Sequence, residues 1–406
     1  MTDTTAQTTA SAATPKPNRR TFGELLTSEL RALPVIIGLV VLWLFFTMQS
    51  DVFLSARNIS NLLLQSTVVG IMALGLMFVL LVKEIDLSVA AINGVTAVLM
   101  AKLIVEFGFS PMIAIPAAII VGVGIGMCSA RWVTYVGVPS FVVTLGLGLA
   151  LNGVQFILLP DTARYGLMNT GIEKIAQLKI SGAGAWMSFA VFFAIAASLI
   201  LSNARRSARA GLQRSKMNTI ILPLAGGGFL GALIVFILNS HQGIPLITLI
   251  FAALLMLGGY VLKETSFGLS LYAVGNNDEA ARRAGIKVAQ VKMAAFGIAG
   301  GIAALAGIIG ASRTLGVGVF SGGGVGGGTL LLESIAAAVI GGVSLFGGRG
   351  AIYSALLGAL VIGTVQNGLN LMGVENEIRL IVTGFLLVLA VSIDKIIEKA
   401  TGQQAF

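Results

Sequence analysis

The residue types that carry acid–base or metal chemistry are scarce in this chain of 406 residues. It contains one histidine, His241, and one cysteine, Cys128. A lone histidine and a lone cysteine supply neither a zinc site nor a histidine-based catalytic cluster, and they exclude an intrachain disulfide. The phosphate-binding pattern GxxxxGK followed by Ser or Thr is also missing from the sequence. We therefore expect no catalytic residue, no metal and no cofactor, and we do not expect an enzyme.

Two carboxylates, Glu84 and Asp86, lie in a short polar stretch between two apolar runs. Acidic residues next to a membrane interior mark ion paths or structural networks. The alternative is a turn that faces water, in which Asp86 or Ser88 caps the helix that follows. On physical grounds the water-facing turn is the favoured interpretation.

Uncharged polar side chains within or near the apolar runs are candidates for the path of a polar solute, because they offer hydrogen bonds without fixed charge. Ser140 and Thr144, for example, lie one helical turn apart on the same face. For any single residue, a hydrogen bond to a neighbouring helix or backbone is the favoured alternative. The candidate path residues are Asn93, Ser140, Thr144, Asn152, Gln366 and Asn367.

The stretch at residues 265–288 is polar and separates long apolar runs, so we expect it outside the membrane. Its second half predicts a very short helix, with Asp278 as the N-terminal cap and Gly285 as the stop. Glu279 belongs to the first turn, and two arginines lie toward the other end, as helix polarity favours. Such a short helix is marginal alone in water.

Three alanines, Ala280, Ala281 and Ala284, give this predicted helix a face with almost no side chain. Such a face lets the backbone of another protein approach closely. We interpret the segment as a docking element for a partner outside the membrane. The alternative, given equal weight on the loop alone, is a helical loop that only joins two spans.

The composition is that of a membrane protein, with 56% hydrophobic and only 11% charged residues, against about 25% charged in soluble domains. The charges are bunched, which leaves uncharged runs suited to spanning a bilayer. We predict an all-α, polytopic integral membrane protein with 10–12 transmembrane helices. The uncharged runs are 32–50, 58–82, 87–101, 107–130, 132–160, 180–204, 217–262 (two spans), 293–312, 350–374 and 380–393. A further candidate span, 330–346, is interrupted by Glu333.

The placement of lysine and arginine predicts the orientation, because cytoplasmic loops carry an excess of both. If all runs cross, most of the 26 basic residues fall on the side of the two termini. We therefore expect a disordered cytoplasmic tail at 1–31, a transmembrane domain at 32–394 with a cytoplasmic loop at 263–292, and a cytoplasmic tail at 395–406. This topology accounts for the net charge of +9, so lipid headgroups are expected partners and nucleic acid is not.

Four stretches between about residues 55 and 394 resemble the permease subunits of bacterial ABC-type monosaccharide importers, the ribose, galactose and xylose family. The stretches are 84–88, then 138–141 with 144–146, then 272–276 with 279–281 and 285–286, and finally 335–337 with 341–348. Two extra predicted spans, at about 182–240, look like the xylose or multiple-sugar subgroup. The chain departs from the family's pattern at Ala90, at Asn276 or Asn277, and at Ser334.

The resemblance implies a permease subunit that moves a monosaccharide, xylose or a related sugar, across the bacterial inner membrane. The implied partners are a twin-cassette ATP-binding subunit that supplies the energy, a periplasmic sugar-binding protein and a second copy of the permease. The short cytoplasmic helix would be the coupling helix that sits in a groove of the ATPase. The coupling residues implied are Gly275, Asn276, Asp278, Glu279, Ala280, Ala281 and Gly285.

A second hypothesis is an ion-coupled secondary transporter of a small polar solute. In that case an acidic residue near the membrane interior would bind the coupling ion. The candidates are Glu84, Asp86 and Glu333.

Overall fold

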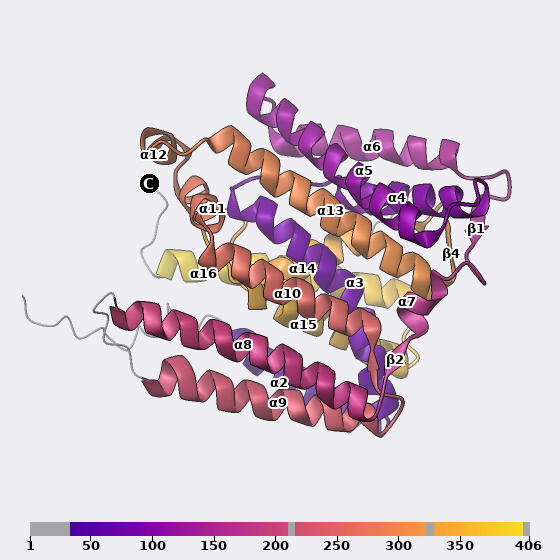
Figure 1. Ribbon diagram of the computed structural model, residues 1–406, viewed down its shortest axis with the longest axis vertical. Coiled ribbons are helices and arrows are strands. Elements are labelled where there is room, and N and C mark those ends of the chain that lie inside the picture. Colours follow the sequence, from indigo (N-terminus) through magenta and orange to yellow (C-terminus); the bar gives the residue numbers. More distant parts are fainter. Residues whose placement is uncertain (1–32, 210–215, 322–328, 401–406) are drawn as a thin grey trace, which may run out of the picture.

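The computed structural model describes residues 33–209, 216–321 and 329–400. The predicted N-terminal tail at 1–31 and the last residues, 401–406, lie outside this part of the chain. Within it, the fold is a bundle of long helices that run roughly side by side (Figure 1).

Twelve helices of 12 to 27 residues, here called the long helices, make up the bundle in the described ranges. They are α2 (Leu33–Gln49), α3 (Ala56–Leu81), α4 (Val89–Val105), α5 (Pro111–Arg131), α6 (Ser140–Leu158), α8 (Ala183–Arg209), α9 (Leu222–Asn239), α10 (Leu246–Glu264), α13 (Val288–Thr314), α14 (Thr329–Ile340), α15 (Ile352–Leu371) and α16 (Asn376–Ala400). Three short helices, two π-helical turns and four short strands connect them. These are α7 (Glu173–Gln177), α11 (Ser266–Asn276), α12 (Asp278–Arg283), η1 (Trp132–Val136), η2 (Met217–Ile221), β1 (Arg164–Gly166), β2 (Lys179–Ile180), β3 (Ile244–Pro245) and β4 (Gly316–Gly318).

The prediction of an all-α polytopic membrane protein is confirmed. Each predicted apolar run overlaps one long helix, and the double run at 217–262 forms the hairpin of α9 and α10. Among the described residues, eight helices are long and apolar enough to cross a membrane, and α2, α4 and α14 are shorter apolar helices. The helix α16 continues to Ala400, into the stretch expected to be the C-terminal tail.

The two ends of the bundle carry different polar structure. Helices α11 and α12 lie together at one end, which we call the α12 end (Figure 1, left). At the opposite end β1 pairs antiparallel with β4, and β2 with β3, and we call this the β1–β4 end. The small sheets join loops that are far apart in sequence, since Tyr165 lies opposite Val317.

The core is formed by α3 and α13, which are buried along most of their length. Glycines let α5 pack directly on α13. A methyl group at Gly126 would overlap the carbonyl of Phe296, and one at Gly300 would overlap the carbonyl of Gly122. Close backbone approach at small residues is the usual means by which membrane helices associate. In contrast, α8 and α9 are exposed over most of their surface, which is suited to lipid.

The short length of α4 has a structural cause. Residues 84–88 form a non-helical segment that runs along the first turns of α6. The amide of Ile85 donates to Ser140 Oγ at 3.1 Å, and the amide of Leu87 donates to Thr144 Oγ1 at 3.0 Å. This segment covers part of the span before α4 begins, so the 15-residue run at 87–101 need not cross the bilayer alone.

Candidate coupling site at α12

The short helix α12 is capped at both ends by side-chain and backbone chemistry. Asn277 is the N-cap, and its Oδ1 accepts a hydrogen bond from the amide of Ala280 at 2.9 Å. The prediction that Asp278 is the cap is therefore wrong, because the preceding amide side chain takes that position. Gly285 follows the last turn with φ +83°, a left-handed conformation that favours glycine, so its predicted role as the stop is confirmed.

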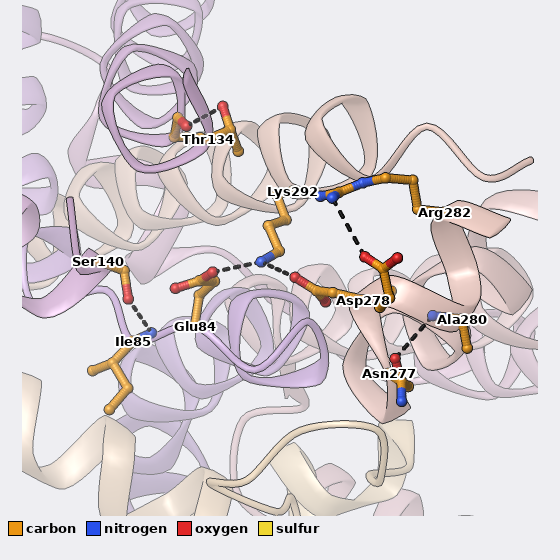
Figure 2. Close-up of polar contacts among 11 residues, drawn as sticks. Glu84, Ile85, Thr134, Ser140, Asn277, Asp278, Ala280, Arg282 and Lys292 are labelled. Carbon is orange, nitrogen blue, oxygen red and sulfur yellow. Dashed lines mark hydrogen bonds and ion pairs between the residues drawn. The ribbon is translucent and has the colours of Figure 1, made fainter. Parts of the chain in front are cut away.

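Lys292 fixes α12 to the rest of the bundle. Its Nζ lies 2.6 Å from Asp278 Oδ2 and 2.7 Å from Glu84 Oε1, so one ammonium group bridges two carboxylates (Figure 2). The Lys292 and Glu84 side chains are only 13% and 14% exposed, whereas Asp278 is 40% exposed. The bridge joins three elements: α12, the second turn of α13 and the segment at 84–88. A six-residue helix needs such tertiary contacts, since it is not stable on its own.

The surface of α12 is divided between the bundle and the solvent. Ala281 is buried, while Ala280 and Ala284 are exposed, so the predicted alanine face is split between the two sides. Glu279 is exposed and pairs within the helix with both arginines, at 3.2 Å to Arg283 Nε and 3.7 Å to the Arg282 guanidinium. The free face therefore consists of small side chains beside three charged ones.

The helix α11 is seated tightly against the end of α3. A methyl group at Gly275 would overlap the carbonyl oxygen of Leu81, which accepts a hydrogen bond from the amide of Gly348 at 3.0 Å. Tyr272 donates to the carbonyl of Gly350 at 2.8 Å, and burial raises the pKa of this phenol above its ordinary value. Asn276 is exposed and donates only to a backbone carbonyl of its own helix, 2.8 Å away.

The segment at 84–88 connects this site to the membrane interior. Asp86 is fully buried, so the interpretation that it faces water in a turn is wrong. Lys83 and Ile85 are exposed, and Ser88 occupies the N-cap position of α4, although its side chain makes no capping hydrogen bond. The Oδ1 of Asp86 accepts from the amide and the hydroxyl of Ser88, at 2.8 and 2.6 Å, while the Oδ2 of Asp86 has no hydrogen-bond partner in the described part of the chain. The contacts of Ser140 and Thr144 with this segment favour the structural alternative for both hydroxyls.

The same face of α6 also reaches the opposite end of the bundle. Gln155 lies about three turns beyond Thr144, and its Nε2 donates to the carbonyls of Gly318 and Ser321 at 3.0 and 3.1 Å. A chain of polar contacts thus runs from α12 through Lys292 and the segment at 84–88 to α6, and then to the loop after β4.

The remaining path candidates lie in different surroundings. Asn93 is buried and donates to the carbonyl of Ala303 on α13 at 3.1 Å. Asn367 exchanges two hydrogen bonds with Asn58 on α3, at 2.8 and 3.0 Å. These contacts favour interhelical bonding for both asparagines. The Oδ1 of Asn152 has no hydrogen-bond partner among the described residues.

Gln366 differs from the other candidates because it lines a polar pocket, together with Glu333.

The sequence did not reveal the roles of Lys292 and Asn58. Each binds a residue more than 200 positions away, and no local pattern marks either pair. Within the described ranges, no group of three or more His, Cys, Asp or Glu side chains is placed to hold a metal ion.

The sequence of the chain matches a family of known proteins. The family model described as "Branched-chain amino acid transport system / permease component" matches residues 58–391. The xylose transport system permease protein XylH of Escherichia coli K12 is 34% identical over 314 residues, which cover 76% of this chain and 78% of that protein. XylH of Haemophilus influenzae is 35% identical, covering 74% and 80%, and the ribose import permease protein RbsC of Escherichia coli K12 is 31% identical, covering 73% of each chain. No solved structure matches. The chain belongs to this family of membrane permease components.

Proposed function

We propose that this protein is the membrane-spanning permease subunit of an ABC importer for a monosaccharide, xylose or a related sugar. Its relatives are named for xylose and ribose transport, and the match covers about three quarters of the chain. Energy would come from a separate twin-cassette ATPase, and sugar would be delivered by a periplasmic sugar-binding protein. The permease would act as a homodimer in the bacterial inner membrane, in contact with its lipids, with both termini in the cytoplasm.

The observation that carries this proposal is the attachment of α12. The helix is too short to be stable alone, yet it is capped at both ends and bound to the bundle by Lys292. Its outer face remains free, and the residues on it are small or charged. Such a helix can move as a rigid unit when a partner moves, and so transmit the displacement to the membrane helices. The coupling residues are therefore proposed to act as a unit, with Gly275 seating α11 and Ala281 facing inward.

Coupling to the solute would run along the polar contacts that start at Lys292. Movement of α12 would shift the segment at 84–88, and α6 would follow because its hydroxyls hold the backbone of that segment. Nucleotide binding by the ATPase would in this way bias a two-state arrangement of the membrane helices.

The alternative of an ion-coupled transporter is less favoured by the same contacts. Glu84, one of its candidate ion ligands, is already paired with Lys292. A carboxylate in such an ion pair has little remaining affinity for a coupling ion.

A substitution at the end of α12 tests the proposal. Gly285→Leu forces a side chain into a left-handed conformation, which costs about 1–2 kcal/mol and distorts the C-terminus of α12. The matched control is Gly373→Leu, since Gly373 has φ +69° and lies at the β1–β4 end, and neither glycine has an atom near its missing Cβ. In liposomes that contain the full transporter, Gly285→Leu should abolish most ATP-dependent D-xylose uptake, while Gly373→Leu retains it. Gradient-driven uptake without any ATPase would overturn the proposal.

A further inference from the structure

A polar pocket of about 410 Å³ opens into the half of the bundle nearer the β1–β4 end. Five long helices contribute to it: α3, α13, α14, α15 and α16. Three of its lining residues are charged, five are neutral and polar, and four are apolar. The lining consists of Gln65, Val68, Val69, Arg313, Thr329, Leu330, Glu333, Gln366, Asn370, Arg379, Leu380 and Thr383.

The lining is incompatible with hydrocarbon. Arginine and glutamate side chains at membrane depth are costly unless they face water, protein or a solute path. Glu333 lies one turn into α14 and Gln366 lies more than one turn inside the end of α15, so neither belongs to a surface loop. The pocket is therefore suited to water or a polar molecule and not to lipid.

The polar groups of the pocket are organised around Glu333. The side chains of Gln366 and Thr329, which come from different helices, lie beside this carboxylate and interact with it. Across the pocket, the Arg379 guanidinium makes only a long contact of 3.4 Å to Asn370 Oδ1, and its Nε is buried without a hydrogen-bond partner among the described groups. The pocket thus offers both an acceptor network and an unused donor.

This combination matches the surface of a sugar. Vicinal hydroxyl groups both donate and accept hydrogen bonds, which carboxylate, amide and guanidinium groups can satisfy together. The C–H face of a sugar ring is apolar and suits Val68 and Leu330. The volume falls within the range of roughly 300–1,000 Å³ that is typical of small-molecule sites.

We propose that this pocket is a binding station for the sugar on its way through the membrane, with Glu333, Gln366 and Arg379 as the groups that contact its hydroxyls. The inference rests on the proposed function, because it assumes that the solute is a neutral monosaccharide. It goes beyond that function by assigning a site within one chain.

Cysteine accessibility tests the site directly, since the chain has a single cysteine. Cys128 lies exposed on α5, and Cys128→Ser provides a background without a thiol. In this background Thr383→Cys is treated with a small, charged, water-soluble thiol reagent in membranes that contain the full transporter. Gln65→Cys is a second pocket variant in case the first fails to fold, and neither residue is among the three proposed sugar contacts. Glu377→Cys, on the exposed first turn of α16 and outside the pocket lining, is the control.

The expected result is that both pocket cysteines react and that D-xylose at high concentration slows their reaction several-fold, while the control cysteine reacts equally with and without sugar. Pocket cysteines that do not react, or that sugar does not protect, would overturn the inference. Equal protection by sodium chloride would also overturn it, because the site would then hold ions and not sugar. ATP-dependent D-xylose uptake by the Cys128→Ser protein is measured in parallel. Loss of sugar protection while this uptake persists refutes the pocket alone, whereas absence of uptake refutes the proposed function.

Discussion

Replacement of Lys292 by methionine should release α12 from the bundle. The change removes the cation that bridges Glu84 and Asp278 and keeps a side chain of similar length. Breaking a fully buried ion pair by removing one partner costs about 3–5 kcal/mol. Glu84 is 14% exposed, so losing its ion pair costs less than this, about 2 kcal/mol. Asp278 is 40% exposed, so losing its ion pair adds at most about 1 kcal/mol after solvent screening.

The loss of the Glu84 ion pair alone, about 2 kcal/mol, corresponds to roughly a 30-fold increase in the fraction of molecules with α12 detached. Ala281 reports this opening, because it is only 4% exposed and faces the bundle. In the Cys128→Ser background, Ala281→Cys should react with a water-soluble thiol reagent about 30-fold faster when Lys292→Met is added. The Lys292→Met change should also lower ATP-dependent sugar uptake, while the amount of protein in the membrane stays the same.

The matched control is Lys287→Met, which removes an exposed lysine just before α13. It should leave both the reaction rate and the uptake near their starting values. An equal effect of Lys287→Met and Lys292→Met on the rate would refute the reasoning, because the effect would then reflect charge and not the bridge. A further check is Glu84→Gln combined with Lys292→Met, which should recover part of the stability because it leaves one fewer unpaired carboxylate.

Two further outcomes follow from contacts away from α12. Asn367→Leu should lower the free energy of unfolding by about 2 kcal/mol, because it leaves Oδ1 of the buried Asn58 amide without its donor, while Nδ2 keeps its bond to the Phe53 carbonyl. Adding Asn58→Leu should recover part of the loss in thermal unfolding assays. The hydrogen bond from Tyr165, and then the contact with Lys102, hold the pKa of Glu106 below its usual value. This stabilisation is present above the ordinary carboxylate pKa and is lost as the pH falls through the lowered value, so Tyr165→Phe should weaken the pH dependence of the unfolding temperature in acid.

Much of the fold could be predicted from the sequence, because in a membrane the apolar runs and the helices are governed by the same constraint. The short helix α12 was also predictable, since Gly285 marks its end. Its cap was assigned to Asp278 and not to Asn277, because both residue types cap helices and a shift of one position leaves no trace in composition.

The long-range contacts of the candidate site could not be predicted from the sequence. The pairing of Lys292 with Glu84 depends on how α3 and α13 cross, and no local pattern encodes that crossing. Burial of Asp86 was missed for a related reason. A short polar stretch suggests a turn in water, but here hydroxyl groups of α6 hold its backbone inside the bundle. The polar pocket draws on five helices and is likewise a property of the tertiary structure.

In the proposed transporter, the ATP-binding subunit binds the free face of α12. Ala280 is exposed on that face, and Met168 is exposed at the β1–β4 end. In the Cys128→Ser background, Ala280→Cys and Met168→Cys can each carry a short photo-crosslinker in the assembled transporter. The account predicts that only Ala280→Cys cross-links to the ATP-binding subunit. Cross-linking of that subunit from Met168→Cys, with none from Ala280→Cys, would contradict it.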